Sequence, residues 1–140
     1  MNGLRVFLLT GSLAASMCSA QGAVPGALSS KLLSLAGSDS RDCGSVALHD
    51  KADAAIACAT QAASAGAAYR VAIEFEGADS IAWQGAARDA QGKLWAVFYD
   101  ADRPGSSGAG TTLSVVLCRD IVFASQGDDL IVCKPVIGAH

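Results

Sequence analysis

The four cysteines that follow residue 20 constrain the fold more than any other feature of the sequence. They are Cys43, Cys58, Cys118 and Cys133. An even set of cysteines in a small exported chain is typical of disulfide bonds, which such chains need because their apolar cores are small. Since four cysteines permit three pairings, the partners must be assigned from local geometry. We therefore expect a fold held together by two disulfides.

The segment 118–133 has the pattern of a β-hairpin, because two apolar runs flank a turn signal at 125–127. A four-residue loop at 124–127 would place Cys118 directly opposite Cys133. Opposed residues in an antiparallel pair have Cα atoms ~4.5–5.5 Å apart, a separation that a disulfide accepts. We therefore predict that Cys118 bonds to Cys133, which leaves Cys43 to bond to Cys58.

A reactive thiol is the alternative for the second pair, with Cys43 or Cys58 as the nucleophile and His49 as its base. The Cys-Gly-Ser at Cys43 begins like the motif around a papain-type nucleophile, but the Cys and Trp that follow in that motif are absent. Stabilisation is therefore the preferred role for these cysteines.

The first 20 residues have the layout of a secretory signal peptide. A single positive charge at Arg5 precedes an uncharged, mainly apolar stretch, and small residues stand near Ala20. The stretch is shorter than the ~20 apolar residues that a membrane-spanning helix needs. We predict cleavage after Ala20 and a mature protein that is periplasmic or secreted.

Cys18 offers an alternative to simple cleavage, because a lipid attached to this cysteine would tether the mature protein to a membrane surface. Met17 argues against lipidation, because lipoprotein signals carry a small residue directly before the lipidated cysteine and methionine is bulky. Cleavage after Ala20 is therefore preferred.

The charge balance argues against partners that carry many negative charges. The sequence has 10 Lys and Arg against 13 Asp and Glu, and removal of the signal peptide takes Arg5 with it. Nucleic acids and anionic membranes are normally met by a basic face, whereas the basic residues here are scattered singly. We expect no nucleic-acid binding, no membrane span and no cofactor, and a partner that is a protein or a small ligand.

The remaining chain predicts a single α+β domain over residues 42–140, after a flexible segment at 21–41 that is rich in Gly, Ser and Ala. A short edge strand at 45–49 is expected to lead into an alanine-rich helix, with Asp50 as its N-cap and Gly66 as its C-cap. The buried stripe of this helix is expected to consist of Ala52, Ala55, Ile56, Ala59 and Ala63.

Alternation of apolar and polar residues predicts the strands that follow the helix. They cover about 69–77, 79–89, 94–100, 111–123 and 130–137. In the first of these strands, the alternation predicts one buried face and one face in water. We expect one alanine-rich helix packed across a four- to five-stranded antiparallel meander.

The loop that begins at Asp100 imitates two ligand-binding patterns and completes neither. A calcium loop is matched by Asp100 and Asp102, but Pro104 and Thr111 occupy positions that need ligands. A phosphate loop starting at Gly105 has Thr111 in place of its lysine. The preferred interpretation is a turn between two strands. No metal centre is predicted, and Asp100 and Asp102 remain the candidates for a cation.

Candidates for hydrolysis are equally incomplete. Glu74 and Glu76 share one strand face and resemble the paired carboxylates of acid–base catalysis, although solvated strands carry such pairs routinely. A triad from Ser80 and His49 lacks the glycine of a nucleophile elbow. The two histidines, His49 and His140, have no zinc-ligand spacing. We assign no catalytic residue.

The aromatic residues give the best candidate for a binding surface. Trp83 lies on one strand of a predicted hairpin, while Trp95 and Tyr99 share a face of the other strand. A contiguous exposed aromatic patch marks a binding surface, unless a second element of the fold covers it. The sequence therefore predicts a small exported, non-enzymatic binding module, with a small periplasmic hydrolase using paired carboxylates and possible calcium as the alternative.

Overall fold

A computed structural model of the chain describes residues 23–103, 110–124 and 129–138. In chain order its elements are α1 (Gly26–Ala36), β1 (Arg41–Val46), α2 (Asp53–Ser64), β2 (Tyr69–Glu76), β3 (Ser80–Arg88), β4 (Leu94–Asp102), β5 (Thr111–Phe123) and β6 (Ile131–Pro135). The predicted signal peptide with Cys18, the turn signal at 125–127 and His140 lie outside the described residues. Neither helix of the described ranges is long and apolar enough to cross a membrane.

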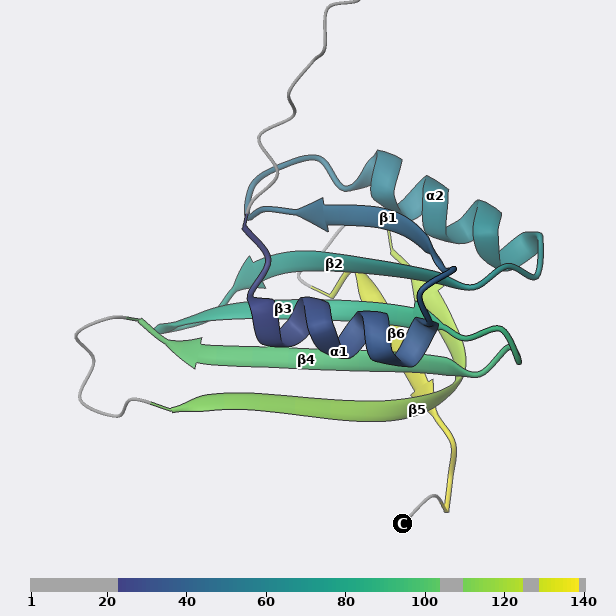
Figure 1. Cartoon of the computed structure of the whole chain (residues 1–140). Coiled ribbons are helices and arrows are strands. Elements are labelled where there is room, and N and C mark those ends of the chain that lie inside the picture. The colour runs from purple at the N-terminus through teal and green to yellow at the C-terminus, as the bar shows by residue number, and fades with distance from the viewer. Residues whose placement is uncertain (1–22, 104–109, 125–128, 139–140) are drawn as a thin grey trace, which may run out of the picture.

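The six strands form one sheet in the order β1-β2-β3-β4-β5-β6 (Figure 1). β1 and β2 are parallel, and every other neighbouring pair is antiparallel. The α+β class is confirmed, but the prediction of one helix on a purely antiparallel meander is only partly right. The reason is that α2 carries the chain back to the start of the sheet, so β2 runs alongside β1 instead of against it.

α2 is the alanine-rich helix expected from the sequence. Gly66 follows its C-terminus with a φ of 70°, and the backbone N–H groups of Gly66 and Ala67 donate to the carbonyls of Ala63 and Ala62, which satisfies the last turn. Asp50 is not the N-cap, because the helix begins later, after Ala52. Its buried residues are Ala55, Ala59 and Ala62, whereas Ala63 of the predicted stripe is exposed.

α1 lies inside the segment predicted to be flexible, so that prediction is wrong for residues 26–36. Its buried residues are Leu28, Leu32 and Ala36, which recur every four positions and therefore share one helix face. The sequence pattern did not reveal this helical spacing of four residues, because the surrounding Gly and Ser residues have a low hydrophobicity. The consequence is that a second helix is available to cover the other face of the sheet.

The two helices cover opposite faces of the sheet, as Figure 1 shows with α1 in front of β3 and β4. Tyr69, Val71 and Ile73 of β2 belong to the core beneath α2, while Ala72 belongs to the core beneath α1. Successive residues of a strand point to opposite faces, so β2 contributes to both cores. The predicted wet face of this strand is therefore covered where α1 crosses it.

Both predicted disulfides are present. Cys43 bonds to Cys58 and Cys118 bonds to Cys133, with 5.5 Å between the Cα atoms of each pair. The first bond joins the edge strand β1 to α2, and the second joins β5 to β6. Since Cys43 and Cys58 are bonded to each other, neither is the thiolate nucleophile of the alternative interpretation.

The register of the β5–β6 hairpin differs from the predicted one. Cys118 pairs with Pro135, and Cys133 pairs with Ile121, with a register shift between Cys118 and Asp120. A bulge of this kind puts one extra residue into one strand and bends it. The bend brings Cys118 within disulfide distance of Cys133 although the two cysteines are not directly opposed.

The bent hairpin folds back over the α2 side of the sheet, where β6 contacts β3 and β4 as well as β5. Ile131 of β6 is buried in the same core as Tyr69 and Ala86, and Phe123 packs against that core. The ring centroids of Tyr69 and Phe123 are 6.3 Å apart. Small side chains such as Ala86 leave room for the hairpin to approach the sheet.

Gln84 fastens the folded-back hairpin to β3. Its side chain is almost fully buried. Its Nε2 donates to Asp129 Oδ1 at 2.9 Å, and its Oε1 accepts the backbone N–H of Ile131 at 3.3 Å. A buried amide with both ends satisfied stabilises one arrangement of the hairpin on the sheet.

Burial of Tyr69 predicts a measurable dependence of stability on pH. Loss of water around the phenol raises the pKa of Tyr69 to about 12, against an opposing effect of the Arg88 charge. In the unfolded chain the phenol ionises near pH ~10. Its contribution to stability is therefore complete below pH ~10 and is lost as the pH rises towards 12.

A titration of tyrosinate absorbance should show one phenol that ionises near pH 12 while the protein stays folded. The free energy of unfolding, measured with denaturant, should fall between pH 10 and 12. Tyr69→Phe is the control and should flatten that fall. An unchanged pH dependence in the variant would contradict this assignment.

Candidate functional site

A cleft opens on the α1 side of the sheet, beside the residues that lead into α1. Its volume is about 330 Å³, and it is lined by Ala23, Pro25, Glu74, Ile81, Trp83, Tyr99 and Ala101. We call it the aromatic cleft. Its wall comes from the segment before α1, and its floor comes from β2, β3 and β4.

The register of the sheet explains why these side chains meet. Glu74 pairs with Trp83, and Trp83 pairs with Tyr99. Paired residues of antiparallel strands have side chains on the same face with Cβ atoms ~4.5–5.5 Å apart. A carboxylate, an indole and a phenol therefore follow one line across three strands.

Glu74 is the charged group of the aromatic cleft. It is half-buried, and its Oε2 accepts the backbone N–H of Leu48 at 2.9 Å. Leu48 lies in the connection between β1 and α2, so this hydrogen bond holds the carboxylate in place. Within the described ranges no further hydrogen bond or ion pair is formed by Glu74, which leaves Oε1 available to a ligand.

The three predicted aromatic residues share one face of the sheet but do not form one exposed patch. α1 covers Trp83, which is only 2 % exposed. Tyr99 is half-buried and lines the cleft, while Trp95 is half-buried and does not. The sequence analysis considered the alternative that a second element of the fold hides the aromatic residues. For Trp83 this alternative is correct, because α1 covers it. The sequence analysis missed the part played by Glu74 because the covering helix was not anticipated.

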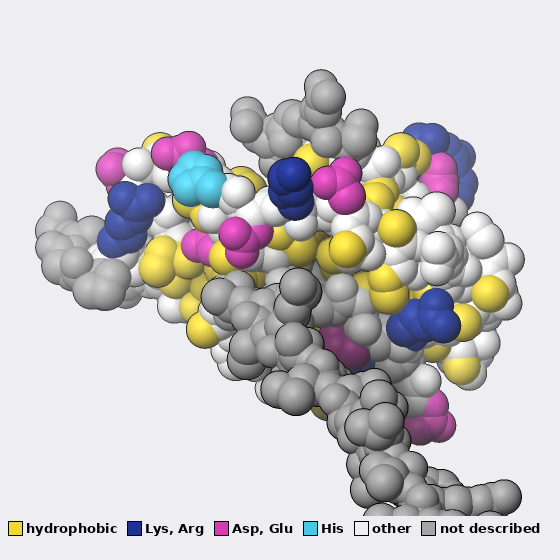
Figure 2. All heavy atoms as spheres, turned by 90° about the horizontal axis from the view of Figure 1, so that it is seen from above, with side chains coloured by type: hydrophobic (Ala, Val, Ile, Leu, Met, Phe, Trp, Pro, Cys, Tyr) yellow, Lys and Arg dark blue, Asp and Glu magenta, His cyan; other side chains and the backbone are white. Residues whose placement is uncertain are grey.

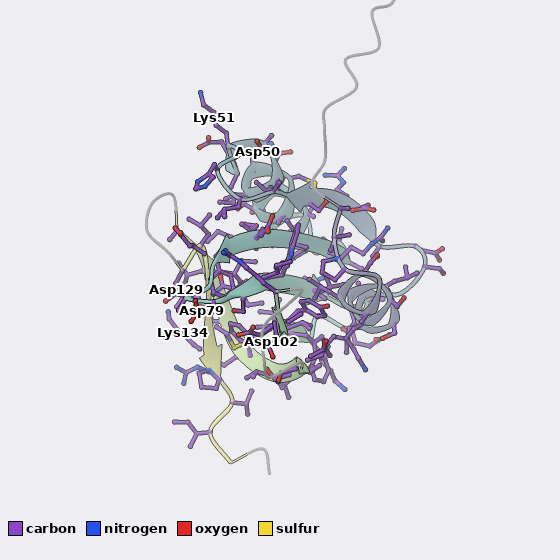
Figure 3. The ribbon with its side chains drawn as sticks, turned by 90° about the vertical axis from the view of Figure 1, so that its left-hand side faces the viewer. Asp50, Lys51, Asp79, Asp102, Asp129 and Lys134 are labelled. Atoms are coloured by element: carbon purple, nitrogen blue, oxygen red, sulfur yellow. A yellow bond between two sulfur atoms is a disulfide. The ribbon has the colours of Figure 1, made fainter. Side chains whose placement is uncertain are left out.

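The cleft lies at the acidic end of the molecule. The carboxyl ends of β1, β2 and β4 meet at this end of the sheet, because β4 runs in the same direction as β2. Figure 2 shows acidic side chains gathered around the histidine there, and Figure 3 looks onto this end, with Asp50, Asp79 and Asp102 labelled. Residues 47–53, 74–80 and 100–103 lie at this end of the sheet and contain two cations, Lys51 and Arg103. The same residues contain seven carboxylates: Asp50, Asp53, Glu74, Glu76, Asp79, Asp100 and Asp102.

The two predicted carboxylate pairs lie on opposite faces of the sheet. Glu74 shares its face with Tyr99, and Asp100, the next residue after Tyr99, points to the other face. Asp102 closes the base of its loop, since its Oδ2 accepts the backbone N–H of Gly110 at 2.9 Å. The rest of that loop, 104–109, lies outside the described residues, and with it most of the calcium-loop and phosphate-loop patterns.

His49 has a structural position that the sequence did not indicate. Its φ is 71°, in the left-handed region, and it belongs to a turn closed by the Asp50 N–H, which donates to the Ala47 carbonyl at 3.0 Å. His49 is exposed, and within the described ranges no hydrogen bond joins it to Ser80. His49 and Ser80, which the sequence analysis considered and set aside as part of a triad, are not joined in the structure.

A second cleft lies on the opposite face, between β6 and the strands β3 and β4. It has a volume of about 410 Å³ and is lined by Gln84, Phe98, Val116, Asp129, Ile131, Val132, Cys133 and Pro135. The Gln84 amide of this cleft is satisfied at both ends, because it donates to Asp129 Oδ1 and accepts from the Ile131 N–H. The aromatic cleft differs in that its carboxylate, Glu74, is half-buried and held by a backbone N–H, whereas Asp129 of the second cleft is exposed.

A comparison with known proteins finds no protein family, no curated protein and no solved structure that matches this chain.

Proposed function

We propose that the mature chain is a small exported, non-enzymatic binding module that takes a ligand in the aromatic cleft. The observation that carries the proposal is the cleft itself, with Glu74 anchored through Leu48 beside the rings of Trp83 and Tyr99. Small-molecule sites are typically concave and mostly apolar, with a few fixed polar groups. The aromatic cleft has this composition.

The signal-like layout of residues 1–20 and the two disulfides support export to the periplasm or the cell exterior. Disulfides persist in oxidising compartments and are rare in the cytosol. The two disulfides of this chain join β1 to α2 and β5 to β6, on the two sides of the strands that form the floor of the cleft. A prefolded cleft lowers the entropic penalty of binding.

The sheet edges support binding in a cleft rather than by addition of a strand. On β6, the N–H of Ile131 is occupied by Gln84, and Pro135 has no N–H to donate. On β1, the register shifts between Asp42 and Ser45. Capped and irregular edges discourage pairing with another chain. The faces of the sheet are therefore the better candidates.

The alternative of a small hydrolase has less support. Of the four carboxylates considered for it, only Glu74 lines the aromatic cleft. Two carboxylates on opposite sides of one scissile bond are needed for the expected chemistry. No second candidate function is therefore advanced.

A fragment screen on the mature chain, followed by nuclear magnetic resonance of backbone amides, tests the proposal. Binding fragments are expected to shift the amide signals of residues around Trp83 and Tyr99. Ala101→Phe fills the cleft and should abolish binding, whereas Ala57→Phe, on the exposed side of α2, should preserve it. Retained amide dispersion shows that each variant is folded.

Fragments that map to the second cleft, or an absence of binding at both clefts, would contradict the proposal. Chemical conversion of a bound fragment, visible as new ligand signals, would favour the hydrolase instead.

A further inference from the structure

We infer that the ligand of the aromatic cleft is an organic cation, with an ammonium group attached to a small apolar body. The inference rests on the proposed function and names the chemical class of its ligand. It combines three observations about the described residues: the free oxygen of Glu74, the aromatic floor, and the acidic surroundings of the cleft.

The first observation is the state of Glu74. One carboxylate oxygen is held by the Leu48 N–H, and the other has no partner within the described ranges. Among the described residues no Lys or Arg pairs with this carboxylate, whereas the ion pairs Arg70–Asp42 and Lys134–Asp120 neutralise other acidic groups. A half-buried carboxylate with a fixed position and an unused oxygen is suited to a positively charged ligand group.

The second observation is the pair of rings next to Glu74. Trp83 and Tyr99 follow Glu74 in one cross-strand line. The face of an aromatic ring attracts a cation within ~6 Å of its centroid, and quaternary ammonium groups are recognised in this way. Trp83 is only 2 % exposed beneath α1, so the half-buried ring of Tyr99 is the one that a ligand would contact. A carboxylate beside an accessible ring favours a diffuse organic cation over a neutral ligand.

The other walls of the cleft select for an apolar body. They come from Pro25, Ile81 and Ala101, which offer no side-chain hydrogen bond. Among the described residues no group of three or more metal-ligating side chains is found, and Glu74 is the one carboxylate among those that line the cleft. The volume of about 330 Å³ is near the lower limit of small-molecule sites, ~300 Å³, and fits a small ligand.

The third observation is the negative electrostatic potential that the carboxylates around the cleft produce. The carboxylates at this end of the sheet, shown in part in Figure 3, outnumber the cations Lys51 and Arg103. Charges of one sign around a cleft raise the local concentration of oppositely charged ligands. The field would attract cations to the end of the molecule where Glu74 and the rings are placed.

The test compares choline with 3,3-dimethylbutan-1-ol, a neutral molecule of the same shape, by amide-shift titration of the mature chain. Choline is expected to bind at least about tenfold more tightly, which corresponds to ~1.4 kcal/mol. Its shifts should centre on Trp83 and Tyr99, and its affinity should fall as salt is added. A lysine-containing tetrapeptide with blocked ends, run in parallel, tests a protein side chain as the source of the ammonium group. Tighter binding than choline assigns the ligand to a protein, and weaker binding assigns it to a small free cation.

Glu74→Gln is the decisive variant, because glutamine keeps an oxygen for the Leu48 N–H and removes only the charge. It should weaken choline binding about tenfold and leave the neutral alcohol unchanged. Glu76→Gln is the matched control on the same strand face, since Glu76 is exposed and does not line the cleft. Glu76 lies two residues from Glu74 on the same strand face, but its exposed charge is screened and touches no ligand in the cleft, so this variant should weaken choline binding by less than Glu74→Gln does.

Equal affinities for choline and the alcohol, or equal effects of the two glutamine variants, would overturn the inference. If neutral fragments still bind in the cleft, the proposed binding function stands and only the ligand class is wrong. If neither choline nor any fragment binds there, both proposals fail.

Discussion

Replacing Cys118 and Cys133 together by alanine is expected to lower the free energy of unfolding by about 3 kcal/mol. The two cysteines are 15 residues apart in the sequence, and the bond restricts the unfolded chain by closing a loop of that length. In the folded protein it holds the bent β5–β6 hairpin against the sheet, and Cys118 is buried. For a chain of this size the melting temperature should fall by about 10–15 °C.

Denaturant unfolding of the mature, oxidised chain measures this loss. The matched comparison is the Cys43→Ala, Cys58→Ala variant, whose disulfide spans the same sequence separation of 15. Equal loop lengths give equal chain-entropy effects, so any difference between the variants reports packing. We expect the Cys118 and Cys133 variant to be the less stable one, because Cys118 is buried and Cys43 and Cys58 are only half-buried.

Two results would contradict the role assigned to the disulfides. The first is alkylation of these cysteines in native material under denaturing, non-reducing conditions, which requires free thiols. The second is a loss below about 1 kcal/mol in both alanine variants, since loops of this length are expected to contribute more.

Leu32→Ala is the second substitution with a large expected effect, a loss of about 3 kcal/mol in the free energy of unfolding. Leu32 is 3 % exposed on the inner face of α1. A Cβ atom added at Gly85 would lie 2.8 and 2.9 Å from the two Cδ atoms of Leu32. The leucine therefore occupies the space that the glycine leaves open on β3.

This contact predicts coupling between the two positions. Gly85→Ala alone should destabilise the fold, by about 1–3 kcal/mol, because the buried leucine has to shift. In the Leu32→Ala background the same change should have little effect, since the clash is gone. The double variant should therefore be more stable than the sum of the single losses predicts, by at least about 1 kcal/mol.

Leu33→Ala is the control on the next residue of α1, because Leu33 is 43 % exposed. It should lower the free energy of unfolding by less than about 1 kcal/mol. A strictly additive double variant, or equal losses for Leu32→Ala and Leu33→Ala, would show that α1 does not pack on β3 through this contact.

The sequence was a good guide where local chemistry decides the structure. The alanine-rich helix and the hairpin turn between β3 and β4 both follow from patterns a few residues long. In the 89–93 turn, Asp89 Oδ1 accepts the N–H groups of Gln91 and Lys93, and Gly92 has a φ of 87°. Such turns depend on residues next to one another in the chain.

The sequence was a poor guide where distant segments decide the structure. The correct pairing of Cys118 with Cys133 rested on a register that the bulge near Asp120 alters. α1 was missed because Leu28, Leu32 and Ala36 form a narrow stripe, which becomes stable through packing on Gly85 and its neighbours. Short helices gain most of their stability from tertiary packing.

The candidate site, too, could be predicted from the sequence only in part. The aromatic residues were identified from their positions on two strands, but the cleft depends on the segment at Ala23 and Pro25 and on the hydrogen bond from Leu48 to Glu74. Both come from parts of the chain outside the hairpin. A carboxylate on a strand acquires its role from neighbours that its own sequence context does not reveal.

The position of Ala23 and Pro25 in the wall of the cleft affects how the recombinant protein should be prepared. An affinity tag fused close to Ala23 would add chain next to the wall of the cleft. The other end of the chain is a better attachment point, because the Val136 N–H donates to the carbonyl of Leu117, which pairs with Trp95 at the far end of β4 from Ala101. A carboxyl-terminal tag, or none, therefore suits the ligand titrations.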